Sequence, residues 1–596
     1  MAEEKRGYTI SDIYQGGYSS MSPEKSYGGG YFSAGSLGMT TDPRSANILQ
    51  EVSTKLASGV KQIEIEAVSP EIFDSIPKQQ LKEVNRLTKL TGIDVSLHGP
   101  VIDVSGIDPR GGGFSETDRE NAERRVADVL LRSHELNPDG NIPVNFHSAE
   151  GIPGSQFLPP SERKDGERYK RMIVVNKETG RIAPLESEIE YLPGMKELEK
   201  GKYRTAEQTL DKVNTTEWDN SVTQLIFNKQ RFDEVINDVK PFLEPLQDPQ
   251  TGEIKVENQE YLTQKQKEVY KRYLSARDYL DNVYRAINSQ FSKAWKFGDE
   301  HKKNVLKEIS NDFVQKIEKK PKDPFTYSEA MGDFLHDLKS SQVIPQIYVP
   351  IEEFAVEKSS KTYGNAAWEA YKKYKDKSPL LTIENPPAGF ALSTGEDVKN
   401  IVEKSREQFV KNAVTNGLSE DDAKEQAEKL IGATWDVGHI NMLRKFGYSE
   451  KDIVKETEKI APLLKHVHLS DNFGFEHTEL PMGMGNVPLK EMMEKLGEKG
   501  FNARKIIEAA SWWQHWKTPP FQESLEAMGS PVYGMKMAPY WSQATGLYQG
   551  YFSGFGQMLP QINYETFGTG FSRLPSELGG QIQGAGGSRM SGRQME

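Results

Sequence analysis

Eight short runs rich in apolar residues recur along the chain, and amphipathic stretches with apolar residues at spacings of three and four lie between them. Alternating strands and helices predict a parallel sheet, and eight repeats favour a closed (β/α)₈ TIM barrel over an open sheet. The fold class is therefore expected to be α/β. The expected strands are 36–40, 62–68, 94–99, 143–148, 380–385, 433–438, 466–471 and 505–510.

The spacing between the fourth and fifth expected strands breaks this rhythm. His147 and Glu384 lie 237 positions apart, whereas His98 and His147 lie 49 apart. Because one barrel unit takes about 30 residues, roughly 200 residues are inserted here. The insertion leaves from the carboxyl end of a strand, so we expect it to be able to cover an active site.

The inserted segment itself predicts a mainly helical subdomain. It opens with an expected hairpin, RMIVVNKETGRIAPLE, and continues as charged helices, the clearest from about 259 to 296. An apolar stripe on that helix predicts packing against a partner helix and not a cofactor site. The stripe comprises Tyr273, Leu280, Tyr284, Ile287, Phe291 and Trp295.

These patterns divide the chain into five parts. The expected parts are a Gly/Tyr-rich arm (1–35), the first half of the barrel (36–150), the helical insertion (151–377), the second half of the barrel (378–515) and an aromatic and Gly-rich extension (516–596). The extension is expected to wrap the barrel, to mediate self-association or to be disordered, and the sequence leaves these three open. Its final residues have a composition typical of disorder.

Composition narrows the possible functions. A formal net charge of −12 argues against a general nucleic-acid coat but leaves room for a local groove. The chain has no cysteine, so any metal must bind through nitrogen and oxygen. No leader-like segment and no run of 18 apolar residues is present, which predicts a soluble, cytoplasmic protein that does not enter the membrane.

Imidazole and carboxylate side chains stand at or just past the ends of six expected strands. Such ligands at successive strand ends are what a metal site at the carboxyl face of a parallel barrel requires. One such residue alone is more often structural, but coincidence at six strands is a weak explanation. The candidate metal ligands are His98, His147, Glu384, Asp436, His439, His468, His477, Glu479 and Glu508.

The remaining histidines have ordinary explanations. His466 lies one layer deeper than His468 and is expected to be a hydrogen-bonded core residue. His134, His301 and His336 fall on expected helices, and His515 is expected to pack near the barrel mouth.

The strand-end motifs resemble those of the endonuclease IV and xylose isomerase-like TIM barrel superfamily (AP endonuclease family 2). The motifs are HGP at His98, FHS at His147, ENPPAG at Glu384, DVGH at Asp436, HLSD at His468 and IIEA at Glu508. This superfamily contains DNA-repair phosphodiesterases that act at abasic sites, and sugar isomerases or epimerases. The resemblance covers about 36–150 and 378–515.

For the endonuclease IV branch, the resemblance implies up to three zinc ions. His98 and His147 would hold the first ion, which Glu384 bridges to a second. Asp436, His468 and Glu508 would complete the second set, and His439, His477 and Glu479 would hold a third ion.

Three departures from that branch are visible. His477-x-Glu479 inverts the usual Asp-x-His order, ENPPAG is longer than the usual motif, and Val101 stands where the DNA enzymes usually have tyrosine. DNA recognition is therefore less well supported than metal binding.

Three functions stay open, and the sequence favours the first, because a single-metal sugar enzyme does not need His98, His147, His439 and His477. The first is a metal-dependent phosphoesterase, in which a metal-bound hydroxide attacks a phosphodiester, at abasic sites in DNA or in a small phosphate ester. The second is a sugar or sugar-phosphate isomerase or epimerase, with one Mn²⁺ or similar ion on Glu384, Asp436, His468 and Glu508. In that reading Glu384 and Glu508 also move protons on the substrate. The third is a non-catalytic scaffold, which predicts erosion of the ligand set.

Overall fold

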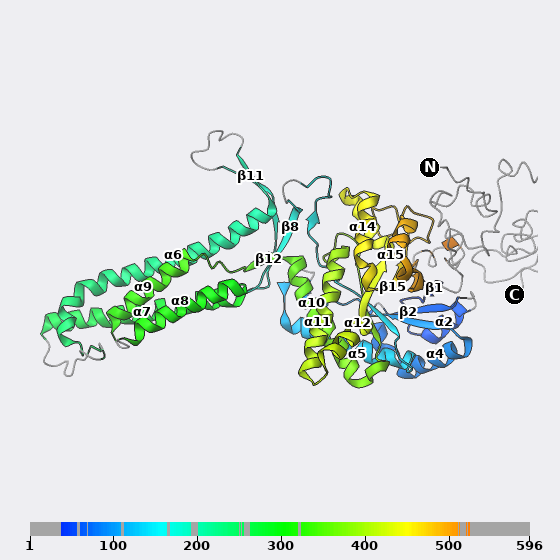
Figure 1. Ribbon diagram of the computed structural model, residues 1–596, viewed down its shortest axis with the longest axis horizontal. Coiled ribbons are helices and arrows are strands. Elements are labelled where there is room, and N and C mark those ends of the chain that lie inside the picture. Colours follow the sequence, from blue (N-terminus) through cyan, green and yellow to red (C-terminus); the bar gives the residue numbers. More distant parts are fainter. Residues whose placement is uncertain are drawn as a thin grey trace, which may run out of the picture. The chain divides into compact units, whose positions relative to one another are not determined.

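Eight parallel strands close into a barrel in the computed structural model of the chain (Figure 1). Around the barrel the strand order is β1-β16-β15-β14-β13-β6-β3-β2, and β1 pairs with both β2 and β16 to close it. All eight expected strands and the α/β barrel class are thereby confirmed. The strands are β1 (Leu37–Thr40), β2 (Gln62–Glu66), β3 (Asp94–His98), β6 (Pro143–His147), β13 (Leu380–Glu384), β14 (Ile431–Asp436), β15 (Leu464–Leu469) and β16 (Arg504–Ile507).

The structure describes residues 37–524, with gaps at 57–59, 68, 109–112, 164–166, 192–200, 249–250, 252, 255–262, 320–322, 510–511, 513–519 and 521–522. The arm expected at 1–35, nearly all of the extension expected at 516–596, and His515 lie outside the described residues.

Helices that follow the strands form the outer layer of the barrel. Local signals start several of them: Ser115 accepts a hydrogen bond from the Asp118 amide at the start of α5, and Ser449 caps α14 together with Asp452. The helices of this unit are α2 (Ile48–Leu56), α3 (Pro70–Ser75), α4 (Lys78–Thr91), α5 (Glu116–Ser133), α10 (Ile351–Tyr374), α11 (Gly395–Thr415), α12 (Glu420–Leu430), α13 (Val437–Asn441), α14 (Glu450–Ile460) and α15 (Leu489–Asn502). Short strands β4 (Ile107–Asp108), β5 (Gly113–Phe114) and β7 (Gln156–Phe157) lie in the loops.

The chain folds into two compact units, and the second runs from Tyr169 to Pro350. This span is narrower than the insertion of 151–377 expected from the sequence. The difference arises because α10 packs along α5 and α11 and buries most of its apolar side chains there. Residues 351–377 therefore belong to the unit that contains the barrel.

The second unit is mainly helical. Its hairpin joins β8 (Tyr169–Asn176) and β9 (Ile182–Glu186) as expected, and β12 (Tyr348–Pro350) pairs with β8. The other elements are β10 (Glu188–Glu190), β11 (Lys202–Arg204), α6 (Ala206–Leu243), α7 (Gln264–Phe297), α8 (Glu300–Glu318) and α9 (Pro324–Ser340). On α7, Leu280 and Ile287 are 2% exposed and join one apolar core with Trp218 of α6. The stripe is therefore a packing surface, except that Trp295 is 38% exposed.

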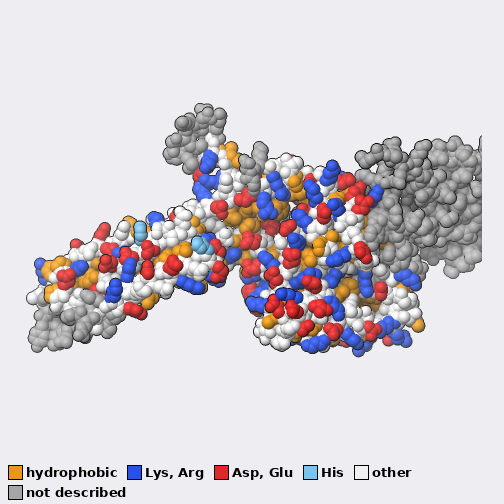
Figure 2. Space-filling view, in the orientation of Figure 1, with side chains coloured by type: hydrophobic (Ala, Val, Ile, Leu, Met, Phe, Trp, Pro, Cys, Tyr) orange, Lys and Arg blue, Asp and Glu red, His pale blue; other side chains and the backbone are white. Residues whose placement is uncertain are grey.

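Both units have strongly charged exteriors. On the face seen in Figure 2, acidic and basic side chains intermix over the described part of each unit. Many of these are pairs one turn apart on a helix, such as Lys229 with Asp233 and Lys424 with Glu420. None of the described helices combines the length and the apolar character that crossing a bilayer would demand.

Candidate metal centre

Side chains from four consecutive strands meet at the carboxyl end of the barrel. Glu384 ends β13, Asp436 ends β14, His468 lies in β15 and Glu508 follows β16, and one ligand atom of each lies within 4.8 Å of the others. Nδ1 of His468 is 2.9 Å from Oε1 of Glu384 and 3.1 Å from Oε2 of Glu508. The Glu508 side chain is 12% exposed, and the other three residues are fully buried.

The alternation of side chains along each strand explains why these ligands meet inside the barrel. In β13, Leu381 and Ile383 alternate with Thr382 and Glu384, so a strand covered by helices outside the barrel directs its polar residues inward. The parallel register then brings the strand ends level, because Glu384 pairs with His147 and Asp436 pairs with His468.

A second group shares Glu384 with the first. Nε2 of His98 is 3.4 Å and Nε2 of His147 is 3.7 Å from Oε2 of Glu384, and the three residues offer ligand atoms within 4.8 Å of one another. The Asn145 amide also donates a hydrogen bond to Oε2 of Glu384. Glu384 therefore stands between two ligand groups, one on each carboxylate oxygen.

The expected third group assembles differently. Nδ1 of His439 lies 2.7 Å from the Asn385 carbonyl oxygen, and its Nε2 lies 2.8 Å from Nε2 of His477. Oε1 of Glu479 is 3.5 Å from the same His477 nitrogen. Among the described residues, these three do not form a group with all ligand atoms within 4.8 Å. Burial, and then His477, lower the pKa of His439 to about 3, so this ring is neutral at pH 7.

The loops around Asp436 fix its position. Its Oδ1 accepts hydrogen bonds from the His439 amide at 2.7 Å and from Oγ of Ser470 at 3.0 Å. Gly438 is required here, because a Cβ at that position would overlap Ser470. The Asn385 side chain in turn pairs with the backbone of Asp436.

The residues of the first group fit a divalent cation. Burial, and then the Glu508 and Glu384 carboxylates, raise the pKa of Asp436 well above its usual range. Oε2 of Glu508 is buried, and its 3.1 Å contact with Nδ1 of His468 does not have the geometry of a hydrogen bond. A cation would relieve the crowding of negative charge, and imidazole with carboxylates suits Zn²⁺, Mn²⁺ or Fe²⁺. These buried groups are therefore able to bind a metal ion.

Sequence reasoning missed two glutamates of β2. Glu64 and Glu66 are 0% and 5% exposed and lie inside the barrel, since Ile63 and Ile65 occupy the alternate positions. Burial, and then Glu508, raise the pKa of Glu66 well above its usual range, which is a sign that Glu66 faces the same site. The signal was the alternation of glutamate and isoleucine in a strand that helices cover from outside.

His466 is buried and bound to Glu64 at 2.9 Å, as expected of a core residue.

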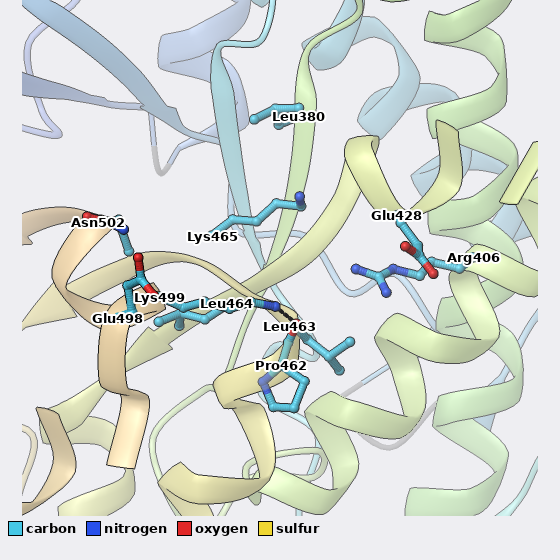
Figure 3. A pocket seen from close by; sticks show the side chains of 11 residues that line it. Leu380, Arg406, Glu428, Pro462, Leu463, Leu464, Lys465, Glu498, Lys499 and Asn502 are labelled. Atoms are coloured by element: carbon cyan, nitrogen blue, oxygen red, sulfur yellow. Dashed lines mark hydrogen bonds between the residues drawn. The ribbon is translucent and has the colours of Figure 1, made fainter. Parts of the chain in front are cut away.

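A cavity of about 590 Å³ lies at the opposite end of the strands, beside Leu380 and Lys465 at the starts of β13 and β15 (Figure 3). Two of its basic side chains hydrogen-bond to the backbone: Arg406 donates to the Ile431 carbonyl oxygen, and Lys499 donates to that of Pro462. None of the candidate ligands lines it. The chemistry of the described residues is therefore concentrated at the carboxyl end.

Comparisons with known proteins support the same barrel type. Residues 407–529, which include Asp436, His468 and Glu508, match the family model described as xylose isomerase-like TIM barrel. An uncharacterized protein of Methanocaldococcus jannaschii is 33% identical over 85 residues, which is 14% of this chain and 28% of that protein's length.

Two solved structures are also similar. A D-tagatose 3-epimerase-like protein aligns with 83% of this chain and 99% of its own, at 12% identity and a TM-score of 0.31. D-Psicose 3-epimerase from Clostridium cellulolyticum H10, solved with D-tagatose, aligns with 86% and 98%, at 9% identity and a TM-score of 0.35. Residues 407–529 thus match a xylose isomerase-like TIM barrel family, and the closed barrel of eight parallel strands has the TIM-barrel fold.

Proposed function

We propose that this protein is a divalent-metal-dependent isomerase or epimerase that acts on a small sugar or sugar phosphate. One observation carries the proposal: Glu384, Asp436, His468 and Glu508 form a single buried ligand set from four consecutive strands. That set combines one metal position with two glutamates that could transfer a proton next to the carbonyl group of a bound sugar. The match to a xylose isomerase-like family supports the same class.

The two glutamates are ionised at neutral pH. Burial alone raises their pKa values, but His468 outweighs it, holding the pKa of Glu384 well below its usual range and that of Glu508 at about 2. Both carboxylates are therefore ionised at neutral pH and can accept a proton from the carbon next to a carbonyl. A bound ion would polarise the carbonyl and hydroxyl oxygens of the substrate.

The surrounding residues fix the orientation of the Glu384 carboxylate. The Asn145 amide and His98 contact Oε2 of Glu384, whereas His468 contacts Oε1. The carboxylate is thus held from both sides, as a positioned base requires. In this proposal His98 and His147 contact substrate hydroxyl groups.

Hydrogen exchange tests the proposal directly. The protein is loaded with Mn²⁺ and incubated in D₂O with a panel of ketoses and ketose phosphates, and NMR follows deuterium uptake next to the carbonyl together with epimer formation. We expect Mn²⁺-dependent exchange with at least one sugar. Glu384→Gln and Glu508→Gln should abolish exchange while leaving the fold intact. Glu458→Gln, which alters a glutamate 54% exposed on α14, is the matched control and should retain it.

Absence of both deuterium uptake and any isomer or epimer product across the panel, at full metal occupancy, would rule out the isomerase and epimerase class. Retained exchange in Glu384→Gln would rule out the role of that residue.

A metal-dependent phosphoesterase of the endonuclease IV type is the second candidate. The observation that favours it is the His98, His147 and Glu384 group beside the first, since two neighbouring ions suit in-line attack on phosphorus. Elemental analysis distinguishes the two: about one ion per chain supports the isomerase, whereas two or three, mainly zinc, support the phosphoesterase. Cleavage of duplex DNA at an abasic site by the zinc-loaded protein would then replace the first proposal.

A further inference from the structure

Glu64 lies beneath the candidate metal centre and contacts two histidines of β15. Its Oε1 is 2.8 Å from Nε2 of His468, and its Oε2 is 2.9 Å from Nε2 of His466. Oγ of Ser96 donates a further hydrogen bond to Oε2 at 2.6 Å. All of these side chains are inside the barrel, and Glu64 is 0% exposed.

The two nitrogens of His468 therefore face different partners. Nε2 faces Glu64, whereas Nδ1 faces Glu384 and Glu508 of the ligand set. An imidazole that binds a metal through one nitrogen keeps its single proton on the other, and a carboxylate can accept that proton's hydrogen bond. Glu64 is placed to favour the tautomer in which Nδ1 is free to bind the ion.

We propose that Glu64 is a positioning residue that fixes the tautomer and ring orientation of His468, and through them the metal affinity of the centre. The inference rests on the proposed metal-dependent function. A carboxylate behind a ligand histidine also raises the basicity of the ring, and loss of such a partner typically weakens metal binding by about 10–100-fold.

Glu64, His466 and His468 also offer ligand atoms within 4.8 Å of one another, and a separate ion on these three is the alternative that the experiment must distinguish. Oε2 of Glu64 is already within hydrogen-bond distance of Ser96 and His466. Oε1 of Glu64 remains for His468, whose Nε2 it contacts at 2.8 Å. His466 therefore has no direct part in metal binding in this proposal.

The test is metal binding by the full chain, measured by calorimetry with Mn²⁺ and by the absorption spectrum of the Co²⁺-loaded protein. Glu64→Gln should weaken Mn²⁺ binding by about 10–100-fold and shift the Co²⁺ bands. Glu64→Asp should recover part of the affinity, because it restores a carboxylate. His466→Gln should keep both the affinity and the bands.

A matched control addresses the general cost of altering a buried carboxylate. Glu352 is 5% exposed and accepts hydrogen bonds from the amide and hydroxyl of Ser155. Glu352→Gln should leave Mn²⁺ affinity unchanged. Unchanged affinity in Glu64→Gln, or an equal loss in Glu64→Gln, His466→Gln and Glu352→Gln, would overturn the positioning role. Loss of one equivalent of metal in His466→Gln would overturn it in favour of a second ion.

If Glu64→Gln does not fold, ¹⁵N NMR of the Zn²⁺-loaded wild-type protein with labelled histidine decides. A proton on Nε2 of His468 and metal on Nδ1 supports the inference, and the reverse arrangement contradicts it. Failure of the proposed function gives a different result: metal binds with the Glu64 dependence described, but no sugar exchanges its proton. Absence of any metal binding by the wild-type protein would remove both.

Discussion

The interior of the barrel and the core of the helical unit are both shielded from water, but their contents differ. The core around Trp218, Leu280 and Ile287 is apolar, whereas the carboxyl end of the barrel buries charged residues such as Glu64, Glu384 and Asp436. Buried charge costs free energy unless it is paired or binds a cation. The barrel therefore buries groups that are able to bind a metal ion, whereas the helical unit buries side chains that pack against one another.

The largest effect on this contrast is expected from Asp436→Asn. The substitution removes a carboxylate from a cluster in which Glu508 and Glu384 already raise the pKa of Asp436. We expect Mn²⁺ affinity to fall by about 100-fold or more, and the metal-free protein to be as stable as wild type or more so. Calorimetry with Mn²⁺ and urea unfolding measure the two quantities. A metal-free variant that is clearly less stable would contradict the view that this charge is retained for binding.

Leu280→Ala in the helical unit is expected to lower stability without changing metal affinity. Leu280 is 2% exposed, so its truncation should cost about 2–5 kcal/mol in the free energy of unfolding. Metal affinity should not change, and calorimetry on the same sample checks this. Tyr279→Ala is the control on the same helix, because Tyr279 is 38% exposed. A parallel loss of metal affinity in Leu280→Ala would mean that the two interiors are not independent.

A smaller effect, on the pH dependence of stability, is expected at Glu352. Burial, and then Asp397, raise the pKa of Glu352 from 4.5 to about 7. Its stabilising contribution is therefore complete below about pH 4.5 and is lost as the pH rises through 7. Relative to Glu352→Gln, the wild-type protein should lose stability between pH 5 and pH 8. Urea unfolding of both proteins at pH 5 and pH 8 tests the direction of this change in stability. A gain in stability of the wild type relative to Glu352→Gln at pH 8 would contradict the prediction.

The smallest effect on the metal centre is expected from removing the helical unit. Replacing Tyr169–Pro350 with a short Gly/Ser linker should leave metal content unchanged, because every candidate ligand lies outside this unit. The expectation from the sequence that the insertion covers an active site further predicts a change in the size of substrate accepted. Elemental analysis and the sugar panel report the two properties. Unchanged selectivity would remove the expectation that this unit acts as a lid.

The strands were predictable because each is a short apolar run that ends in a polar residue. The sequence LLTIEN, for example, predicts both β13 and the position of Glu384 at its carboxyl end. The ligand groups of His98, His147 and Glu384, and of Asp436, His468 and Glu508, follow the same logic. Parallel strands bring their ends together whatever the length of the insertion between them.

Glu64 and Glu66 were not predicted, because their position depends on which face of β2 points into the barrel. QIEIE at β2 reads equally well as a strand with one solvent-exposed face, so the pattern alone does not tell whether Glu64 and Glu66 are inside or outside. The loop with His477 and Glu479 is similar, because Asp471 organises it by accepting hydrogen bonds from the amides of Gly483 and Val487. That arrangement depends on contacts between residues distant in sequence.

The sequence by itself determined the alternating elements and the chemical types at the strand ends, because hydrophobic periodicity and turn residues act over a few neighbouring positions. Only the tertiary structure decided that Glu64 stands behind His468 and that Glu384 is shared between two groups. Barrel closure sets those contacts, since it joins β2 and β15 through β1 and β16, and distances between such strands are not encoded locally.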